Sequence, residues 1–321
     1  MAGPVKGPLG LGLARLMEGL WEARRAMYAR GAWRSEHVPA RVVSIGNLTV
    51  GGAGKTTLVL HLATRLQGEG VRVAVVTRRY RPGPSGCGDE ELLYRAALGE
   101  AAVFAGTSKR DLARAAAAAG YALVLVDDGF SHWPLARDLD VVLLDRTDLW
   151  GGGRMLPAGL LREPIRALQR AGVVVVTRLG PDEDPAPFLD EVRRRAPAAL
   201  LAAARHVPAG VRTLDGVDLT PQGPVRVLTA TGNPRAVAAS AAEAGYSPVT
   251  LATYRDHHWF TRAEAEREHA AARGGTLLLT AKDAVRWPEG APREGVAVLD
   301  TRWSWVVGGD EAEGLIREES R

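Results

Sequence analysis

The chain has 321 residues, of which 46% are hydrophobic, so it is long enough for two ordinary domains or one large α/β domain. Its single cysteine, Cys87, excludes an intramolecular disulfide and a thiolate metal cluster, and no apolar run is long enough to predict a membrane-spanning helix or a signal peptide. The net charge of +4 suits anionic partners, and nucleotide phosphates suffice to explain it without nucleic acid.

Residues 8–30 form the first predicted element, a helix with leucines, Trp21 and several arginines. A basic amphipathic helix with an aromatic residue is typical of a segment that lies on an anionic membrane surface. The same pattern also fits a helix that packs on the domain and exposes its arginines to solvent. The residues alone leave both interpretations open.

The most informative segment is residues 41–57, where a predicted strand at 41–46 leads through a glycine-rich loop into a predicted helix at 55–68. Such a loop turns its backbone N–H groups toward phosphate, Lys55 can reach the β- and γ-phosphates, and the Thr56 hydroxyl can bind Mg²⁺. Thr49 stands where the first glycine of a P-loop is usual. The predicted nucleotide-binding residues are Thr49, Val50, Gly51, Gly52, Ala53, Gly54, Lys55, Thr56 and Thr57.

Strands and helices alternate from residue 41 onward. Nearly continuous apolar runs predict further strands at 71–77, 122–127, 140–145 and 172–177, and helical spacing predicts helices at 88–98 and 108–119. This alternation indicates an α/β fold of the P-loop NTPase type, with a mostly parallel sheet covered by helices. Ligands of such sheets bind at the carboxyl ends of the strands.

Asp127 and Asp128 end one of these apolar strands. In a P-loop enzyme an aspartate at this position lies beside the phosphate loop and holds Mg²⁺ directly or through water. Two adjacent carboxylates also repel each other unless a cation or proton intervenes. A strand-ending turn would explain the same residues, but the P-loop favours the metal site.

A second alternating series follows a Pro- and Gly-rich connection. It predicts strands at 225–230, 249–253, 276–280 and near 296–300, with helices at 234–244 and 261–272. The charged tail past about residue 308 is expected to fray. We therefore expect an N-terminal helical region at 1–35, a P-loop domain at 36–200, a linker at 201–224 and a second, smaller α/β domain at 225–321.

Two further features are ambiguous by themselves. Asp89 begins a predicted helix, and N-capping alone would account for it. His257 follows Asp256, and a histidine beside an aspartate can serve as a general base. Each feature taken alone favours a structural role.

Together these segments resemble the tetraacyldisaccharide 4′-kinase family, the lipid A 4′-kinases. The resemblance runs in family order from about residue 40 to residue 286. The motifs that carry it are 46–56 (GNLTVGGAGKT), 88–90 (GDE), 127–132 (DDGFSH), 137–140 (RDLD), 156–163 (LPAGLLRE), 231–234 (TGNP), 256–258 (DHH) and 280–285 (TAKDAV).

The resemblance implies transfer of the ATP γ-phosphoryl group to the 4′-hydroxyl of a tetraacyldisaccharide 1-phosphate. It also implies two α/β domains joined by a short β linker, with catalysis in the cleft that the second domain closes. The protein would be peripheral at the cytoplasmic face of the inner membrane, where the helix at 8–30 would dock, and we expect a monomer that uses ATP and Mg²⁺.

The resemblance also assigns roles by motif. Lys55 and Thr56 would bind phosphate and Mg²⁺, and Asp127 and Asp128 would lie next to the metal. Asp89 and His257 would deprotonate the sugar hydroxyl, and we expect them to meet only when the two domains close. Arg110 would lie near the transferred phosphate or the acceptor, and Asn47 and Tyr80 would face the disaccharide.

Departures from the family pattern leave alternatives open. Arg79 and Arg81 flank Tyr80 where the family commonly has glycines, and Glu91 replaces a proline, so a variant glycolipid is one possible acceptor. A membrane-associated P-loop ATPase switch is a rival, although such proteins usually carry a lysine where Val50 stands. A GTPase or metallochaperone would need a metal-binding Cys/His cluster and a guanine-reading motif, and neither is found.

Overall fold

A computed structural model describes residues 5 and 7–318. Grouped by their contacts, these residues form two compact units. The P-loop unit contains Ala97–Arg205 together with the described residues before Arg79 and after Arg302. The second unit contains Arg79–Ala96 and His206–Arg302. Strands β7 (Leu200–Thr213) and β12 (Val296–Val307) contribute residues to both units.

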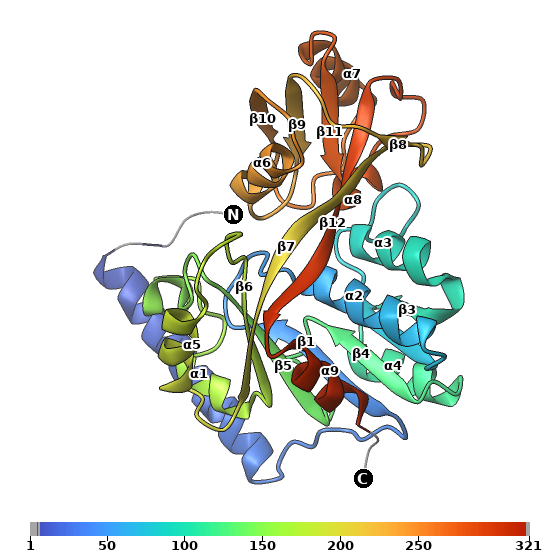
Figure 1. Ribbon diagram of the computed structural model, residues 1–321. Coiled ribbons are helices and arrows are strands. Elements are labelled where there is room, and N and C mark those ends of the chain that lie inside the picture. Colours follow the sequence, from blue (N-terminus) through green and yellow to red (C-terminus); the bar gives the residue numbers. More distant parts are fainter. Residues whose placement is uncertain (1–4, 6, 319–321) are drawn as a thin grey trace. The chain divides into compact units, whose positions relative to one another are not determined.

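The P-loop unit is built on a parallel sheet with the strand order β7-β6-β5-β1-β4-β2-β3 (Figure 1). Strand β1 lies between β4 and β5, so the strand order reverses direction beside it, and such a switch point is where open α/β sheets bind ligands. The remaining strands of this sheet are β1 (Arg41–Asn47), β2 (Val73–Arg78), β3 (Val103–Gly106), β4 (Leu123–Asp127), β5 (Leu139–Asp145) and β6 (Val173–Thr177).

Helices cover this sheet because each presents one apolar stripe. Helix α2 (Lys55–Gly68) buries residues such as Leu58 and Leu62, and α4 (Lys109–Ala118) packs Ala113 and Ala116 against β1, β2 and β4. The other helices are α1 (Pro8–Ala29), η1 (Glu100–Ala102), η2 (Gly151–Gly153), η3 (Ile165–Arg170), α5 (Ala186–Arg193) and α9 (Gly309–Arg317).

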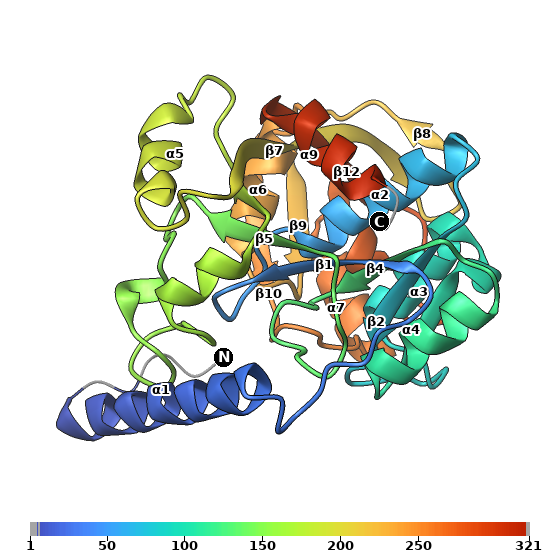
Figure 2. The same cartoon turned by 90° about the horizontal axis from the view of Figure 1, so that it is seen from below.

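Helix α1 lies along the segment between β5 and β6 (Figure 2). Its buried residues Ala14 and Trp21 join an apolar cluster with Phe130 and Trp133, and Arg166 pairs with Glu18 and Glu22. The opposite stripe of α1 is exposed, with Leu9 at 72%, Leu16 at 58% and Leu20 at 57% exposure. In the described residues no helix combines the length and hydropathy needed to cross a membrane.

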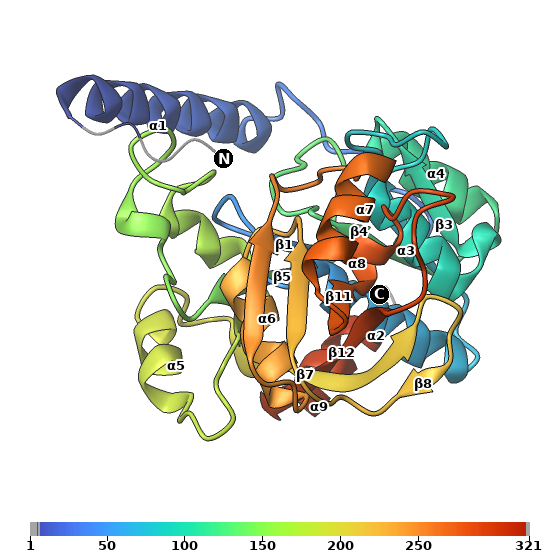
Figure 3. The same cartoon turned by 90° about the horizontal axis from the view of Figure 1, so that it is seen from above.

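The second unit has a smaller sheet in which β10, β9, β11 and β12 are neighbours and run parallel. Alternate side chains of these strands form two apolar clusters, and alternation along a strand places them on opposite faces. Helix α6 contributes to one cluster and the segments flanking α7 to the other, so helices cover both faces (Figure 3). Besides its parts of β7 and β12, the second unit contains α3 (Asp89–Leu98, with its last residues in the P-loop unit), β8 (Asp218–Leu219), β9 (Val225–Thr229), α6 (Pro234–Glu243), β10 (Val249–Thr253), α7 (Arg262–Ala271), β11 (Thr276–Thr280) and α8 (Ala281–Ala284).

The strands and helices predicted from the sequence are present within a few residues of their predicted bounds. The segment 201–224, expected as a linker, contains nearly all of strand β7, which pairs with β6 and β8 and is divided between the two units, so its role as a β linker stays a prediction. One expectation was wrong. The charged tail past residue 308 forms helix α9, because its apolar residues Ala312 and Ile316 are buried and Glu313 binds α2 through His61 and Arg65.

Candidate active site

The glycine-rich loop lies at the carboxyl end of the central strand β1 and leads into α2. Gly51 and Gly54 have φ values of +121° and +91°, which side-chain-bearing residues rarely adopt. The loop is held by β6 and by the segment between β5 and β6, because Thr177 Oγ1 donates to the Ala53 carbonyl at 3.0 Å and Val50 N–H donates to the Leu160 carbonyl at 2.8 Å. This segment therefore has the strand, loop and helix of a phosphate-binding cradle.

Asp128 is the centre of a charged cluster beside this loop. Its carboxylate accepts hydrogen bonds from Arg162 at 2.9 and 2.7 Å and pairs with the Lys55 ammonium at 3.5 Å. Burial opposes ionisation of Asp128, but Lys55 and Arg162 outweigh it, so the pKa of this carboxyl lies well below its usual value. Asp128 is therefore ionised, and its charge is shared by two cations.

Asn47 ends β1 inside the same cluster. Its side-chain oxygen accepts a hydrogen bond from Lys55 Nζ at 3.0 Å and another from Arg162, and its amide nitrogen donates to the Gly51 carbonyl at 3.4 Å. The residue is 1% exposed. Asn47 thus holds the two cations and the loop together, while its expected contact with a disaccharide stays a prediction.

Lys109, the first residue of α4, approaches the acidic pair from another side. Its ammonium donates to the Asp128 carbonyl at 2.5 Å, and Asp128 has a φ of +52°. Burial is the main influence on Lys109 and lowers its pKa, although Asp128 and Asp127 oppose that effect. Lys109 therefore fixes the Asp128 peptide in a conformation that non-glycine residues seldom adopt.

The oxygen ligands near the loop fit a magnesium ion. Thr56 lies in the first turn of α2, and the buried Asp127 ends β4 opposite Ile45 of β1. Glu163 is also buried, and among the described residues its Oε1 has no hydrogen-bond partner. In the described part of the chain no three acidic, histidine or cysteine side chains form a metal site. Mg²⁺ bound to a nucleotide uses one or two protein carboxylates, with phosphates and water as its other ligands.

Asp89 and His257 meet in the second unit. Nδ1 of His257 lies 3.1 and 2.9 Å from the two carboxylate oxygens of Asp89. Lys282 and Arg286 surround the same carboxylate at 3.7 and 3.6 Å. Both members of the pair belong to one unit, so the expectation that they meet only on domain closure was wrong: residues 79–96 pack with residues 206–302.

The charges around Asp89 fix its protonation. Burial opposes ionisation, but the hydrogen bond from His257 and the charge of Lys282 outweigh it and lower the pKa of Asp89 to about 2. An ionised carboxylate only accepts hydrogen bonds, so His257 Nδ1 is the donor. Nε2 of neutral His257 is then left as a proton acceptor.

Tyr80 packs against this pair, with its ring centroid 5.4 Å from that of His257. Its loop is anchored on the 254–260 segment, because Trp259 Nε1 donates to the Arg81 carbonyl at 3.0 Å. Gly83 is required there, since a Cβ at that position would lie 2.5 Å from the Trp259 ring. Tyr80 itself is 45% exposed.

Two departures from the family pattern compensate each other. Arg79 forms two hydrogen bonds to Glu91, at 2.8 and 2.9 Å, and Arg95 binds the same buried carboxylate at 2.8 Å. Arg79 therefore stabilises the start of α3. Its positive charge is neutralised within the second unit.

Arg110 follows Lys109 in the first turn of α4, and its guanidinium faces acidic side chains. Its Nε lies 3.4 Å from Glu36 and 3.2 Å from Asp111. Its expected contact with phosphate or acceptor stays a prediction.

Comparison with known proteins decides the family. The family model described as tetraacyldisaccharide-1-P 4′-kinase (LpxK) matches residues 8–317. The chain belongs to the tetraacyldisaccharide 4′-kinase family.

Curated relatives agree with this assignment. A tetraacyldisaccharide 4′-kinase of Anaeromyxobacter sp. (strain K) is 39% identical over 295 residues, which cover 82% of this chain and 76% of the relative. One of Geobacter metallireducens is 34% identical over 289 residues, covering 82% and 83%. The fold is similar to the crystal structure of LpxK from Aquifex aeolicus in complex with ATP, with a TM-score of 0.67 and 23% identity over 95% of this chain and 96% of that one.

Within this family framework, Arg162 and Lys109 are the two site residues that were not predicted from the sequence. Arg162 lies in the 156–163 motif that carried the resemblance, yet no role was assigned to it. Its signal was an arginine, followed by Glu163, after six apolar or turn-forming residues of the motif. Lys109 gave no signal of its own, because a lysine in the first turn of a predicted helix is usually exposed, whereas this one is 6% exposed.

Proposed function

We propose that this chain transfers the γ-phosphoryl group of ATP to the 4′-hydroxyl of tetraacyldisaccharide 1-phosphate, a precursor of lipid A. Membership of the family supports the reaction and the acceptor. The main structural support for phosphoryl transfer is a cluster beside the glycine loop. In it, Lys55 and Arg162 both bind Asn47 and Asp128.

ATP is the proposed donor. The similar LpxK of Aquifex aeolicus was crystallised in complex with ATP. Gly51 and Gly54 open the loop toward phosphate, and Lys55 is placed by Asn47 at the start of α2. Transfer of a phosphoryl group from ATP to a hydroxyl depends mainly on positioning the two reactants and on neutralising the phosphate charge. Lys55 and Arg162 supply two fixed positive charges for this purpose.

Mg²⁺ is the proposed cofactor, and Thr56, Asp127 and Asp128 are the residues proposed to lie next to it. When bound it would neutralise phosphate charge and orient the β- and γ-phosphates. The Lys55 and Arg162 contacts of Asp128 favour Asp127 as the carboxylate that is closer to the ion. Asp128 would instead keep the two cations in place.

Removal of the hydroxyl proton is proposed for His257. Asp89 accepts from Nδ1 and so fixes the tautomer whose Nε2 can take the proton. A positioned base typically contributes about 10²- to 10⁴-fold to such a step. Tyr80, beside the imidazole, is proposed to contact the sugar. Glu91 neutralises Arg79, whereas Arg81, the other arginine beside Tyr80, lies over the Tyr80 ring at 5.2 Å and leaves this loop cationic.

Peripheral membrane docking through α1 is part of the proposal. One stripe of α1, with Ala14 and Trp21, packs on the P-loop unit, and another exposes leucines to solvent. A helix with an exposed apolar stripe and several arginines suits the interface of an anionic bilayer. The substrate is a lipid, so docking at the cytoplasmic face of the inner membrane would bring the enzyme to it.

The direct test uses purified protein with Mg·ATP and tetraacyldisaccharide 1-phosphate dispersed in a neutral detergent. Mass spectrometry should detect a product heavier by one phosphoryl group, formed only when ATP is present. Absence of this product from a protein that still binds ATP would overturn the proposal.

A further inference from the structure

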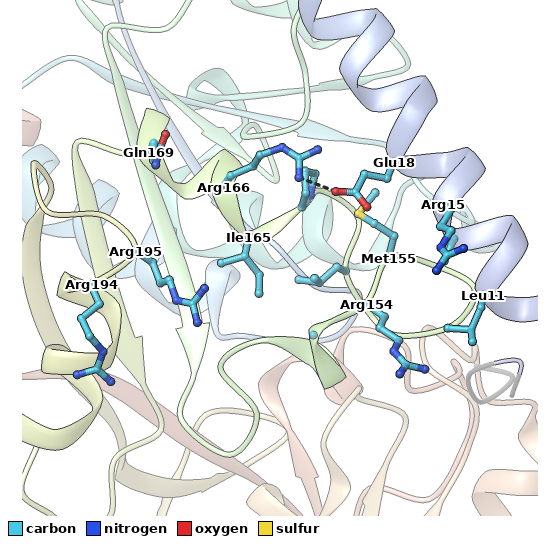
Figure 4. Close-up of a pocket in the computed structure, with 14 residues that line it drawn as sticks. Leu11, Arg15, Glu18, Arg154, Met155, Ile165, Arg166, Gln169, Arg194 and Arg195 are labelled. Carbon is cyan, nitrogen blue, oxygen red and sulfur yellow. Dashed lines mark hydrogen bonds and ion pairs between the residues drawn. The ribbon is translucent and has the colours of Figure 1, made fainter. Parts of the chain in front are cut away.

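A pocket of about 650 Å³ lies between α1, the loop at 153–155, η3 and the end of α5 (Figure 4). Five arginines and one glutamate are among the residues that line it. All belong to the P-loop unit. None of these arginines belongs to the site described above.

Three of the arginines already have acidic partners. Arg166 pairs with Glu18 and Glu22, and Arg194 and Arg195 both pair with Glu191. Arg15 and Arg154 differ, because no described residue forms a hydrogen bond or ion pair with either guanidinium. Both side chains are exposed, and they approach the same end of the pocket near Leu11 (Figure 4).

Arg15 lines the pocket and is also next to the exposed leucine stripe of α1. Arg15 directly precedes Leu16, so the two side chains leave the helix about 100° apart. Leu16 is 58% exposed. If the leucine stripe enters a bilayer, Arg15, which is about a quarter-turn around the helix from Leu16, lies at the level of the lipid phosphate groups. Guanidinium groups bind phosphate through paired N–H donors.

We propose that this pocket binds the phosphate group of an anionic phospholipid, with Arg15 and Arg154 as its ligands. The inference rests on the membrane docking proposed for α1, and it names the lipid class that the docking surface selects. The pocket contributes to membrane affinity, and it plays no part in phosphoryl transfer.

The test measures binding of the full-length chain to vesicles of phosphatidylcholine with and without phosphatidylglycerol. Wild type should bind the anionic vesicles more tightly. The double variant Arg15→Gln/Arg154→Gln should lose roughly 30-fold of that affinity, as expected when two cationic side chains leave an anionic surface. The matched control Arg235→Gln/Arg273→Gln removes the same charge from exposed positions of the second unit and should lose less than about threefold.

Equal losses in the two double variants would show that net charge alone matters and would overturn the proposal, as would unchanged binding in the pocket variant. Kinase assays in neutral detergent without phospholipid give an independent measurement. There the pocket variant should keep the wild-type KM for the acceptor. A raised KM would assign the pocket to the phosphate of the acceptor instead. Wild-type protein without kinase activity would contradict the proposed function but not the vesicle result.

Discussion

Arg162 donates to both carboxylate oxygens of Asp128, at 2.9 and 2.7 Å. Arg162 also reaches the side chain of Asn47, which holds Lys55. One arginine therefore joins the acidic strand end to the phosphate-binding loop. We therefore expect Arg162 to contribute to the proposed chemistry together with Lys55 of the glycine loop.

Replacing Arg162 with glutamine should lower kcat by about 10²- to 10³-fold, because the proposed phosphate site loses one of its two fixed positive charges. The control residue Arg166 lies on η3, and its guanidinium contacts α1 through Glu18, Glu22 and the Trp21 ring. The control variant is Arg166→Gln. It should keep nearly wild-type kcat in neutral detergent. Steady-state kinetics of both variants check the prediction, and equal kcat values in the two would contradict it.

Asp89 makes the stability of the protein depend on pH. Its pKa falls from 3.8 to about 2 on folding, so the ionised carboxylate stabilises the folded state above pH 4. This shift corresponds to about 2 kcal/mol, of which roughly half should be lost by pH 3.

The Asp89→Asn variant should therefore be less stable than wild type at pH 7, and the difference should shrink as the pH falls from 4 toward 3. Urea unfolding followed by circular dichroism at several pH values measures this difference. A difference that stays constant with pH would show that His257, Lys282 and Arg286 do not hold the charge of Asp89.

The exposed leucine stripe of α1 should determine membrane binding. Replacing Leu16 and Leu20 with glutamine removes apolar surface that is exposed in the structure, so folding should be unaffected while binding to vesicles should fall by at least tenfold. Flotation with vesicles measures binding, and thermal unfolding is the control. Unchanged flotation would assign docking to another surface.

Helix α9 should contribute to stability although the sequence suggested a frayed tail. Ile316 is 1% exposed, so Ile316→Ala should destabilise the protein by about 3 kcal/mol. The exposed neighbour Glu311 offers a matched control, and Glu311→Ala should change stability by less than about 0.5 kcal/mol. Denaturant unfolding of the two variants provides the comparison.

The sequence predicted those parts of the fold that depend on local pattern. Apolar runs located β1, β4, β5 and β6, because strands covered on both faces need continuous apolar residues. Strand β7 was missed because its second half is only partly buried and contains proline and glycine. Helix α9 was missed because a few buried residues among charged ones are a weak signal in so short a segment.

The residues of the candidate site likewise fall into those that a local motif predicts and those that depend on contacts distant in the sequence. The glycine loop and the Asp127–Asp128 pair follow from local motifs, whereas Arg162 and Lys109 act through contacts with residues 34 and 19 positions away. The pairing of Asp89 with His257 spans 168 positions. Only the family resemblance indicated it, and packing of α3 in the second unit could not be derived from spacing.

The position of the new phosphate tests the proposed function most directly. Protein incubated with Mg·ATP and tetraacyldisaccharide 1-phosphate should yield a product whose second phosphate is on the 4′ oxygen, as determined by phosphorus and proton NMR. The Lys55→Met variant, assayed in parallel, should form at least about 10²-fold less of it. A phosphate at any other position, or equal product from the variant, would contradict the proposal.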